Sequence, residues 1–277
     1  MNRKFIIIVA IFAGLQITSC KRSNQRVGNI TTDSVAGNAV SDSKEPKNTA
    51  AQIMAKQEVP VLCYHRISDG PKSDYKVSPA TFAAHMKILA DSGYHSISPL
   101  QLYDYLVYNK SLPEKPVIIS FDDSRVEHAL VAAPVMEKNG FRGVFFIMTI
   151  TYNKKNYMTK DQIVQLSKAG HTIGLHSWDH TMVIKYKEPA DWIKEVADPK
   201  KKLEQIVGKP VEYWAYPNGV YDHKGAIELS KYMKLSFTLF SKRDSIVPLQ
   251  TVRRIIVPEC TPQGLLKSMH RAFIKRK

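Results

Sequence analysis

Short apolar runs alternate along this chain with longer segments in which apolar residues recur every three or four positions. The short runs are rich in branched and aromatic residues, which is typical of buried strands. They cover residues 59–65, 94–98, 116–121, 143–148, 171–176, 212–217, 236–240 and 253–258. Strands that alternate with helices predict a mostly parallel sheet covered by helices. With seven or eight such units and the ~200 residues that a closed barrel needs, we expect a (β/α) barrel rather than an open sheet.

The longer segments begin and end at residues that commonly cap helices. Ser78 precedes Pro79, and Gly93 follows the last apolar position, so a helix is expected between them. A second Ser-Pro pair starts another helix after residue 98. Further helices are expected over residues 124–140, with a kink at Pro134, and over 159–170, 189–207 and 261–274.

The N-terminus has the pattern of an export signal. Residues 1–4 are basic, residues 5–15 form an apolar run too short for a comfortable membrane span, and small residues lead to Cys20. This order resembles a bacterial lipoprotein signal, with cleavage before Cys20 and lipidation of that residue. An ordinary secretory signal or an uncleaved anchor is the alternative.

These features predict three parts of the chain. We expect a signal peptide over residues 1–19, and a lipidated Cys20 with a disordered tether over residues 20–57. The tether is polar and lacks aromatic residues. A single catalytic domain is expected over residues 58–277. The protein would be exported and lipid-anchored in the bacterial cell envelope, on its periplasmic or surface face.

Composition adds two points. The formal charge of +15 indicates either a solvated basic surface or attraction to anionic headgroups or an acidic envelope polymer. No nucleic-acid-binding motif is present in the sequence, so nucleic acid is not expected as a partner. If Cys20 carries lipid, Cys63 and Cys260 remain; they are free to form a disulfide in an exported protein, although Cys63 lies in an apolar run and is expected to be a small buried hydrophobe.

Two adjacent carboxylates, Asp122 and Asp123, follow the apolar run 116–121. In parallel α/β folds the carboxyl ends of the strands converge on one pocket. A metal cation would offset the repulsion between two carboxylates at such a strand end. The alternative is a turn in which an Asp caps the next helix.

Two histidines, His176 and His180, lie four residues apart after another predicted strand. On a helical turn, side chains at this spacing share a face. Two imidazoles and one carboxylate suit Zn²⁺ and leave a coordination position for water, while Co²⁺, Ni²⁺ or Fe²⁺ are also compatible. Such a spacing also arises by chance.

Three motifs in this order, SFDDS, HSWDH and AYPNG, resemble those of the polysaccharide deacetylase family, carbohydrate esterase family four. The opening VPVLCYHRI is similar to the extracellular poly-N-acetylglucosamine deacetylase branch, and the likeness extends from Val59 to Ala272. The resemblance implies a deformed (β/α) barrel of about seven strands. It also implies a metal-dependent de-N-acetylase of a GlcNAc-containing polysaccharide in the envelope or biofilm matrix, which the lipoprotein-like signal would anchor to a membrane. Peptidoglycan, an O-acetyl ester, or a catalytically silent carbohydrate-binding lipoprotein are the alternatives.

The resemblance also implies roles for individual residues. Asp123, His176 and His180 would bind the metal, Asp122 would be the general base, and His65 the general acid, with His270 as its rival. The backbone N–H of Tyr216 would stabilise the oxyanion. Ser124 stands where the family usually has Gly, which is expected to cost backbone freedom.

Further residues are candidates for support of the site. Arg253 or Arg254 would pair with Asp122 or lie on the surface. Trp178 and Trp214 would stack on sugar rings or pack in the core. Asp179 would orient a ligand histidine or cap a turn.

Overall fold

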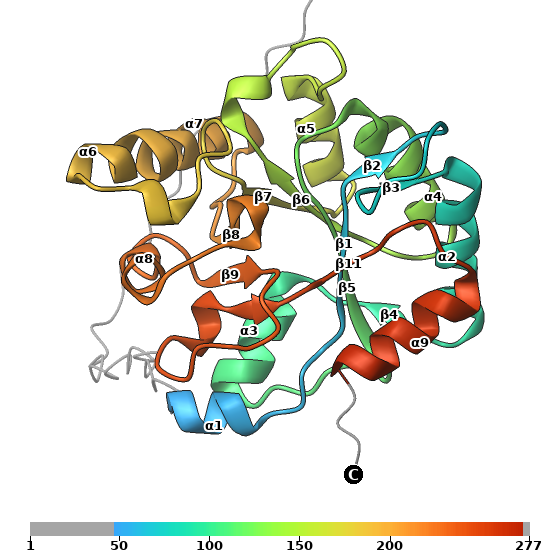
Figure 1. Cartoon of the computed structure of the whole chain (residues 1–277), viewed down its shortest axis with the longest axis horizontal. Helices are drawn as coiled ribbons and strands as arrows, with labels where there is room; N and C mark the ends of the chain where they lie inside the picture. The colour runs from blue at the N-terminus through green and yellow to red at the C-terminus, as the bar shows by residue number, and fades with distance from the viewer. Residues whose placement is uncertain (1–46, 274–277) are drawn as a thin grey trace, which may run out of the picture. The chain divides into compact units, whose positions relative to one another are not determined.

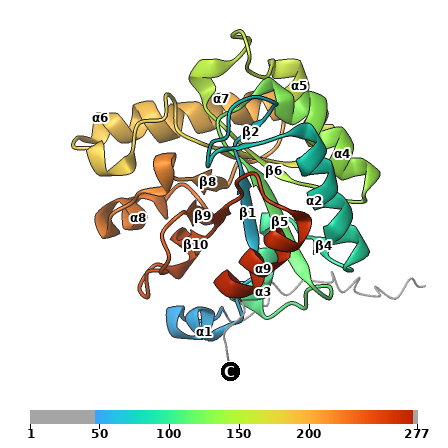
Figure 2. The same cartoon turned by 45° about the vertical axis from the view of Figure 1, so that its right-hand side comes forward.

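The computed structural model describes residues 47–273, and its central feature is a sheet of parallel strands surrounded by helices (Figures 1 and 2). The strands follow the order β10-β9-β8-β7-β6-β5-β1-β11, and β4 also pairs with β5. Their bounds are β1 Val61–Tyr64, β4 His95–Ser96, β5 Pro116–Phe121, β6 Val144–Ile147, β7 Thr172–Leu175, β8 Tyr213–Ala215, β9 Leu235–Thr238, β10 Val252–Arg253 and β11 Ile255–Ile256. Two short strands, β2 Arg66–Ile67 and β3 Lys76–Val77, pair separately.

One short segment brings the two edges of the sheet together. Strand β10 pairs with β9, and β11, which begins two residues after β10 ends, pairs with β1. Between them the Arg254 N–H donates to the Thr238 carbonyl, 3.0 Å. Counting β10 and β11 as one interrupted strand, seven strands make a nearly closed barrel. The predicted parallel barrel of about seven strands is confirmed.

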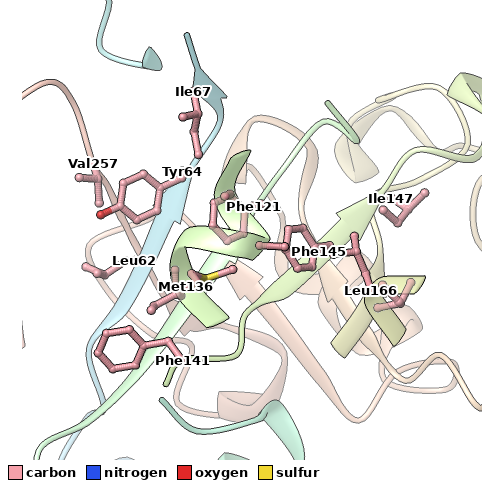
Figure 3. Close-up of a cluster of buried hydrophobic side chains, with 14 of the residues drawn as sticks. Leu62, Tyr64, Ile67, Phe121, Met136, Phe141, Phe145, Ile147, Leu166 and Val257 are labelled. Atoms are coloured by element: carbon pink, nitrogen blue, oxygen red, sulfur yellow. The ribbon is translucent and has the colours of Figure 1, made fainter. Parts of the chain in front are cut away.

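Strand residues alternate between two buried clusters, as the pleat of a strand requires. Leu62, Tyr64, Ile119 and Phe121 pack in the larger cluster, beneath the helices. Figure 3 shows this packing, in which the rings of Phe121 and Phe145 stack with centroids 4.8 Å apart. Val61 and Ile118 belong to the second cluster, on what we call the inner face, together with residues of α1 and α3.

The helices are α1 Ala50–Ala55, α2 Pro79–Asp91, α3 Pro99–Tyr108, α4 Ala133–Lys138, α5 Lys160–Lys168, α6 Pro189–Trp192, α7 Asp198–Val207, α8 His223–Leu229 and α9 Pro262–Phe273. Ser78 and Ser98 cap α2 and α3 with their hydroxyl oxygens, as predicted. The expected kink at Pro134 takes the form of a π-helical turn, His128–Ala132, directly before α4. Within residues 47–273, no helix is both long and apolar enough to span a bilayer.

The structure differs from the sequence prediction at the start of the domain. Residues 50–55, expected in the tether, form α1, which buries Ile53. The Asn48 side chain donates to the Leu106 carbonyl of α3, 2.8 Å. Helix α8 was not predicted either. The signal peptide, Cys20 and the first part of the tether lie outside the described residues.

Candidate active site

The pleat of the strands directs a set of polar side chains to the inner face of the barrel. In β5, Ile118 and Ser120 alternate with residues of the larger cluster, and Asp122, directly after the strand, continues this alternation. In β1, Val61 and Cys63 alternate in the same way. Polar contacts confirm this alignment: Cys63 Sγ is 3.5 Å from Asp122 Oδ2, and Asp122 N donates to the Tyr64 carbonyl, 3.1 Å. Asp122 therefore enters the barrel because it continues the inward alternation of β5.

Asp123 reaches the same region although the alternation of a continuing strand would direct its side chain to the opposite face. The chain turns sharply after β5, with φ of 72° at Asp123 and 57° at Ser124. A left-handed conformation costs about 1–2 kcal/mol for a residue other than glycine. Ser124 offsets part of this, because its Oγ accepts a hydrogen bond from Met148 N, 2.7 Å. Serine is thus accommodated where the family usually has glycine.

The three predicted metal ligands lie close together. Asp123 Oδ1 lies 3.6 Å from Nε2 of His176 and 3.6 Å from Nε2 of His180. All three donor atoms lie within 4.8 Å of one another. Donor atoms around a tetrahedral ion with bonds of ~2.1 Å are ~3.4 Å apart, so this spacing fits a single divalent cation.

The loop after β7 is not the helical turn that the four-residue spacing suggested. Ser177 and His180 have φ of 64° and 75°, and the His180 N–H donates to Ser177 Oγ, 2.7 Å. His176 Nδ1 lies 2.8 Å from the Ala215 carbonyl. A proton on Nδ1 leaves the Nε2 lone pair facing Asp123, as metal-binding histidines require.

Asp122 is held by a buried guanidinium. Arg254 Nη1 donates to Asp122 Oδ1, 2.7 Å, and Nη2 donates to Oδ2, 2.8 Å. Both side chains are almost completely buried. Burial by itself disfavours the charged carboxylate, but Arg254 holds the pKa of Asp122 well below its usual range.

Arg253, the other arginine considered as a partner of Asp122, does not contact it. Its Nε donates to Glu58 Oε2, 2.7 Å, and its guanidinium also reaches the Ala272 carbonyl. Adjacent residues of a strand point to opposite faces, and pairing with β9 and β1 turns Arg254 inward. Of the two arginines that the sequence left open, Arg254 is therefore the partner of Asp122, a choice that depends on a register the sequence does not reveal.

His65 lies beside Asp122, with His65 Nε2 3.9 Å from Asp122 Oδ2. Burial lowers the pKa of His65, and the charges of Asp122 and Asp123 oppose that shift. His270, the rival acid, is exposed on α9. The structure therefore places His65, and not His270, next to the carboxylate pair.

The Tyr216 N–H is not free to bind an oxyanion. It donates to the Phe237 carbonyl, 3.0 Å, as part of the pairing between β8 and β9. This corrects the role expected for Tyr216. Pro217 carries no N–H, so the next backbone donor of the loop is Asn218, whose φ is 56°.

The other candidates divide between structural and surface positions. Asp179 caps a turn, because its Oδ1 accepts from Thr181 N and Oγ1, while Ala215 orients His176. Trp214 is fully buried in the core. Trp178 is partly exposed and lies in the loop from His176 to His180, which we call the histidine loop. Cys63 and Cys260 are free thiols, and Cys63 is buried as expected.

Known proteins resemble this chain in sequence and fold. The family model described as Polysaccharide deacetylase matches residues 109–236, which include Asp122, Asp123, His176 and His180. YxkH of Bacillus subtilis (strain 168), a protein assigned to the polysaccharide deacetylases, is 28% identical over 230 residues, covering 81% of this chain and 81% of YxkH.

Two solved structures extend the comparison. The polysaccharide deacetylase BC0361 from Bacillus cereus is 28% identical with a TM-score of 0.67, over 77% of this chain and 69% of that one. IcaB from Ammonifex degensii is 26% identical with a TM-score of 0.61, over 78% of this chain and 97% of that one. Together with the convergent carboxylates and imidazoles, these matches identify residues 109–236 as a polysaccharide deacetylase segment of the carbohydrate esterase family four type, and the chain is similar to polysaccharide deacetylases over about four fifths of its length.

Proposed function

We propose that this protein removes N-acetyl groups from a GlcNAc-containing polysaccharide of the cell envelope, using a divalent metal ion held by Asp123, His176 and His180. The observation that supports this most directly is that the two neighbouring carboxylates have different partners. Asp123 faces the two imidazoles, whereas Asp122 is held by Arg254 and stays beside them. A site built only to bind sugar would not need both.

The metal ligands and their surroundings suit zinc, as a set of two imidazoles and one carboxylate does in hydrolases. Cobalt, nickel and iron accept the same donors. When bound, a divalent ion would polarise the acetamide carbonyl and make water a stronger acid. The three protein ligands leave room for substrate and solvent.

Asp122 is suited to accept a proton from the attacking water. Arg254 keeps it ionised, and a carboxylate offers about four acceptor positions, of which the guanidinium occupies two. Its Oδ2 lies 3.9 Å from Nε2 of His176, so the carboxylate adjoins the ligands without belonging to them. General-base assistance of this kind contributes roughly 10²–10⁴-fold to rate.

His65 is suited to give a proton to the departing amine. Its ring lies beside Asp122, and its own carbonyl accepts a hydrogen bond from the buried His128, which fixes the main chain there. A fixed donor matters because the amine of an amide leaves only when protonated. The Asn218 N–H is the donor that we propose in place of Tyr216 for the oxyanion.

Two features of the sequence support the proposal that the enzyme acts at the cell envelope. The lipoprotein-like segment ending at Cys20 would tether it to a membrane, and residues between Cys20 and α1 would give it reach. The polymer is either a neutral poly-N-acetylglucosamine or an acidic N-acetylated glycan.

The proposal is tested by acetate release from N-acetylglucosamine oligomers with the full chain in detergent. Chelation is expected to abolish release and added Zn²⁺ to restore it. Asp122→Asn should lower kcat by roughly 10²-fold or more while the protein still binds one ion per chain. Asp123→Asn should lose the ion, and Asp91→Asn, on the exposed face of α2, serves as the matched control. Near-normal rates for Asp122→Asn would refute its role as base, and undiminished rates after chelation would refute the metal.

A further inference from the structure

A pocket of about 460 Å³ lies beside the histidine loop. It is lined by the 3₁₀ turn after β6, by Tyr152, by Trp178 and by residues of α7. Backbone hydrogen bonds join its walls to the site, from Thr149 N to the Ser177 carbonyl, 3.4 Å, and from Ile150 N to the Trp178 carbonyl, 3.0 Å. Its volume is that of a small-molecule pocket, ~300–1,000 Å³. Trp178 lies between His176 and His180 in the chain, so one wall of the pocket belongs to the loop that carries the two histidines.

Aromatic rings form part of its wall. Tyr152 and Trp178 are both partly buried and both line the pocket. Lys160 Nζ lies 5.7 Å from the centroid of the Tyr152 ring, and Lys194 Nζ lies 4.5 Å from that of Trp178. Aromatic faces with polar groups around them suit a sugar ring, which has C–H faces and hydroxyl edges.

The charged side chains that line the pocket are all positive. Lys160 and Lys202 line it, and among its described lining residues there is no Asp or Glu. Within residues 47–273 neither ammonium group has a carboxylate partner, in contrast to Lys194, which is 2.8 Å from Glu195 Oε1. A smaller pocket of about 320 Å³ shares Trp178 and Lys202 and is also lined by Asp198, which forms no ion pair with Lys202 in the described part of the chain.

We propose that this lysine pocket, formed by Tyr152, Lys160, Trp178 and Lys202, binds an anionic sugar next to the acetylated residue. The inference rests on the proposed function and narrows it to N-acetylated glycans that also carry carboxylate or phosphate groups. Concave sites of one sign concentrate ligands of the opposite sign. A neutral poly-N-acetylglucosamine has no charge complementary to two lysines without a carboxylate partner, and the ammonium groups of its deacetylated product would be repelled.

The test compares three oligosaccharides of similar length. One is a neutral N-acetylglucosamine oligomer, one alternates N-acetylglucosamine with the lactyl-bearing N-acetylmuramic acid, and one carries phosphodiesters. The kcat/KM for acetate release is measured for each with the wild type, with Lys160→Gln/Lys202→Gln and with Lys138→Gln/Lys267→Gln. The last variant removes the same charge from exposed positions of α4 and α9. Binding to Asp122→Asn by calorimetry is measured in parallel.

We expect at least one anionic oligomer to be preferred over the neutral one, with the preference in KM and weakened by salt. Lys160→Gln/Lys202→Gln should reduce that preference roughly three- to tenfold, as the loss of exposed charge pairs would. Lys138→Gln/Lys267→Gln should leave it intact. The carboxylate and phosphate arms identify the anion.

Equal kcat/KM values for neutral and anionic oligomers, or an equal loss in both double variants, would overturn the lysine pocket. Failure of the proposed function has a different signature, because no oligomer would then release acetate. In that case calorimetry on the Asp122→Asn protein still tests the pocket. Tighter binding of an anionic oligomer than of the neutral one, lost when Lys160→Gln/Lys202→Gln is added, supports the lysine pocket. Equal binding of the anionic and neutral oligomers refutes it.

Discussion

At the scale of single residues, the pairing of Asp122 with Arg254 sets the chemistry of the site. Two parallel hydrogen bonds join a fully buried guanidinium to a fully buried carboxylate. Removing one partner of such a pair leaves an uncompensated charge, which typically costs about 3–5 kcal/mol. Arg254 therefore both orients the proposed base and makes its burial tolerable.

We expect Arg254→Met to lower the free energy of unfolding by about 3–5 kcal/mol. Acetate release should fall by roughly 10²-fold, because the carboxylate loses its orientation. Urea unfolding and steady-state rates measure the two effects. Arg254→Lys keeps the positive charge but loses the two parallel hydrogen bonds, so both effects should be smaller. Arg253→Met is the control: it breaks a partly buried pair with Glu58, away from Asp122, and should leave the rate unchanged. Equal effects of the two methionine variants would contradict this assignment.

His128 makes the free energy of unfolding depend on pH. It is fully buried, its Nε2 bonds to the His65 carbonyl, and its Nδ1 has no partner among the described residues. Burial lowers its pKa to about 4. Below the unfolded pKa of ~6.5 the unfolded chain takes up a proton that the folded chain refuses, so stability falls as pH drops from ~6.5 to about 4.

In His128→Gln, which keeps a donor for the His65 carbonyl, that part of the pH dependence should disappear. The difference between the two unfolding free energies should change by up to about 3 kcal/mol between about pH 7 and about pH 4. Urea titrations at several pH values give this difference, in which the common contribution of the carboxylates cancels. Parallel curves for the two proteins would show that His128 accepts its proton equally well in both states.

At the scale of elements, α1 shows how tertiary contacts decide where the domain begins. The sequence of α1 is short and weakly patterned, and isolated helices of this length are marginal in water. In the structure Thr49 and Gln52 form a capping box, and Ile53 is buried against the second cluster. Helices α2 and α3, by contrast, were predictable because Ser-Pro caps and apolar spacing agree locally.

Ile53→Ala should lower the free energy of unfolding by about 2–4 kcal/mol, as expected for a buried large-to-small change. Gln57→Ala, at an exposed position near the same helix, should change it by less than ~0.5 kcal/mol. Chemical unfolding followed by tryptophan fluorescence measures both. If the two substitutions had equal effects, α1 would not be an integral part of the fold.

At the scale of the whole domain, the barrel is what assembles the site. Asp123 follows β5, the histidines follow β7, and Arg254 lies between β10 and β11, at the seam where the sheet edges meet. A ligand that bridges β5 and β7 should stabilise the folded state, because the unfolded chain does not bring these residues together.

Zn²⁺ at about 100 times its dissociation constant is expected to stabilise the protein by about 2.7 kcal/mol. For a domain of this size that corresponds to a Tm increase of about 5–10 °C. Differential scanning calorimetry with and without chelator measures the shift, and it should vanish in Asp123→Asn. A shift of the same size in Asp123→Asn would place the ion elsewhere.

The sequence by itself determined the alternation of strands and helices, the caps of α2 and α3, and the residues able to bind metal. These follow from local chemistry: apolar periodicity, hydroxyl caps, and carboxylates and imidazoles at predicted strand ends. Only the tertiary structure decided that Arg254 rather than Arg253 meets Asp122, that the Tyr216 N–H is used by β9, and that residues 50–55 join the fold. Each depends on the register between strands or on packing across the domain, and neighbouring residues do not encode such long-range pairings.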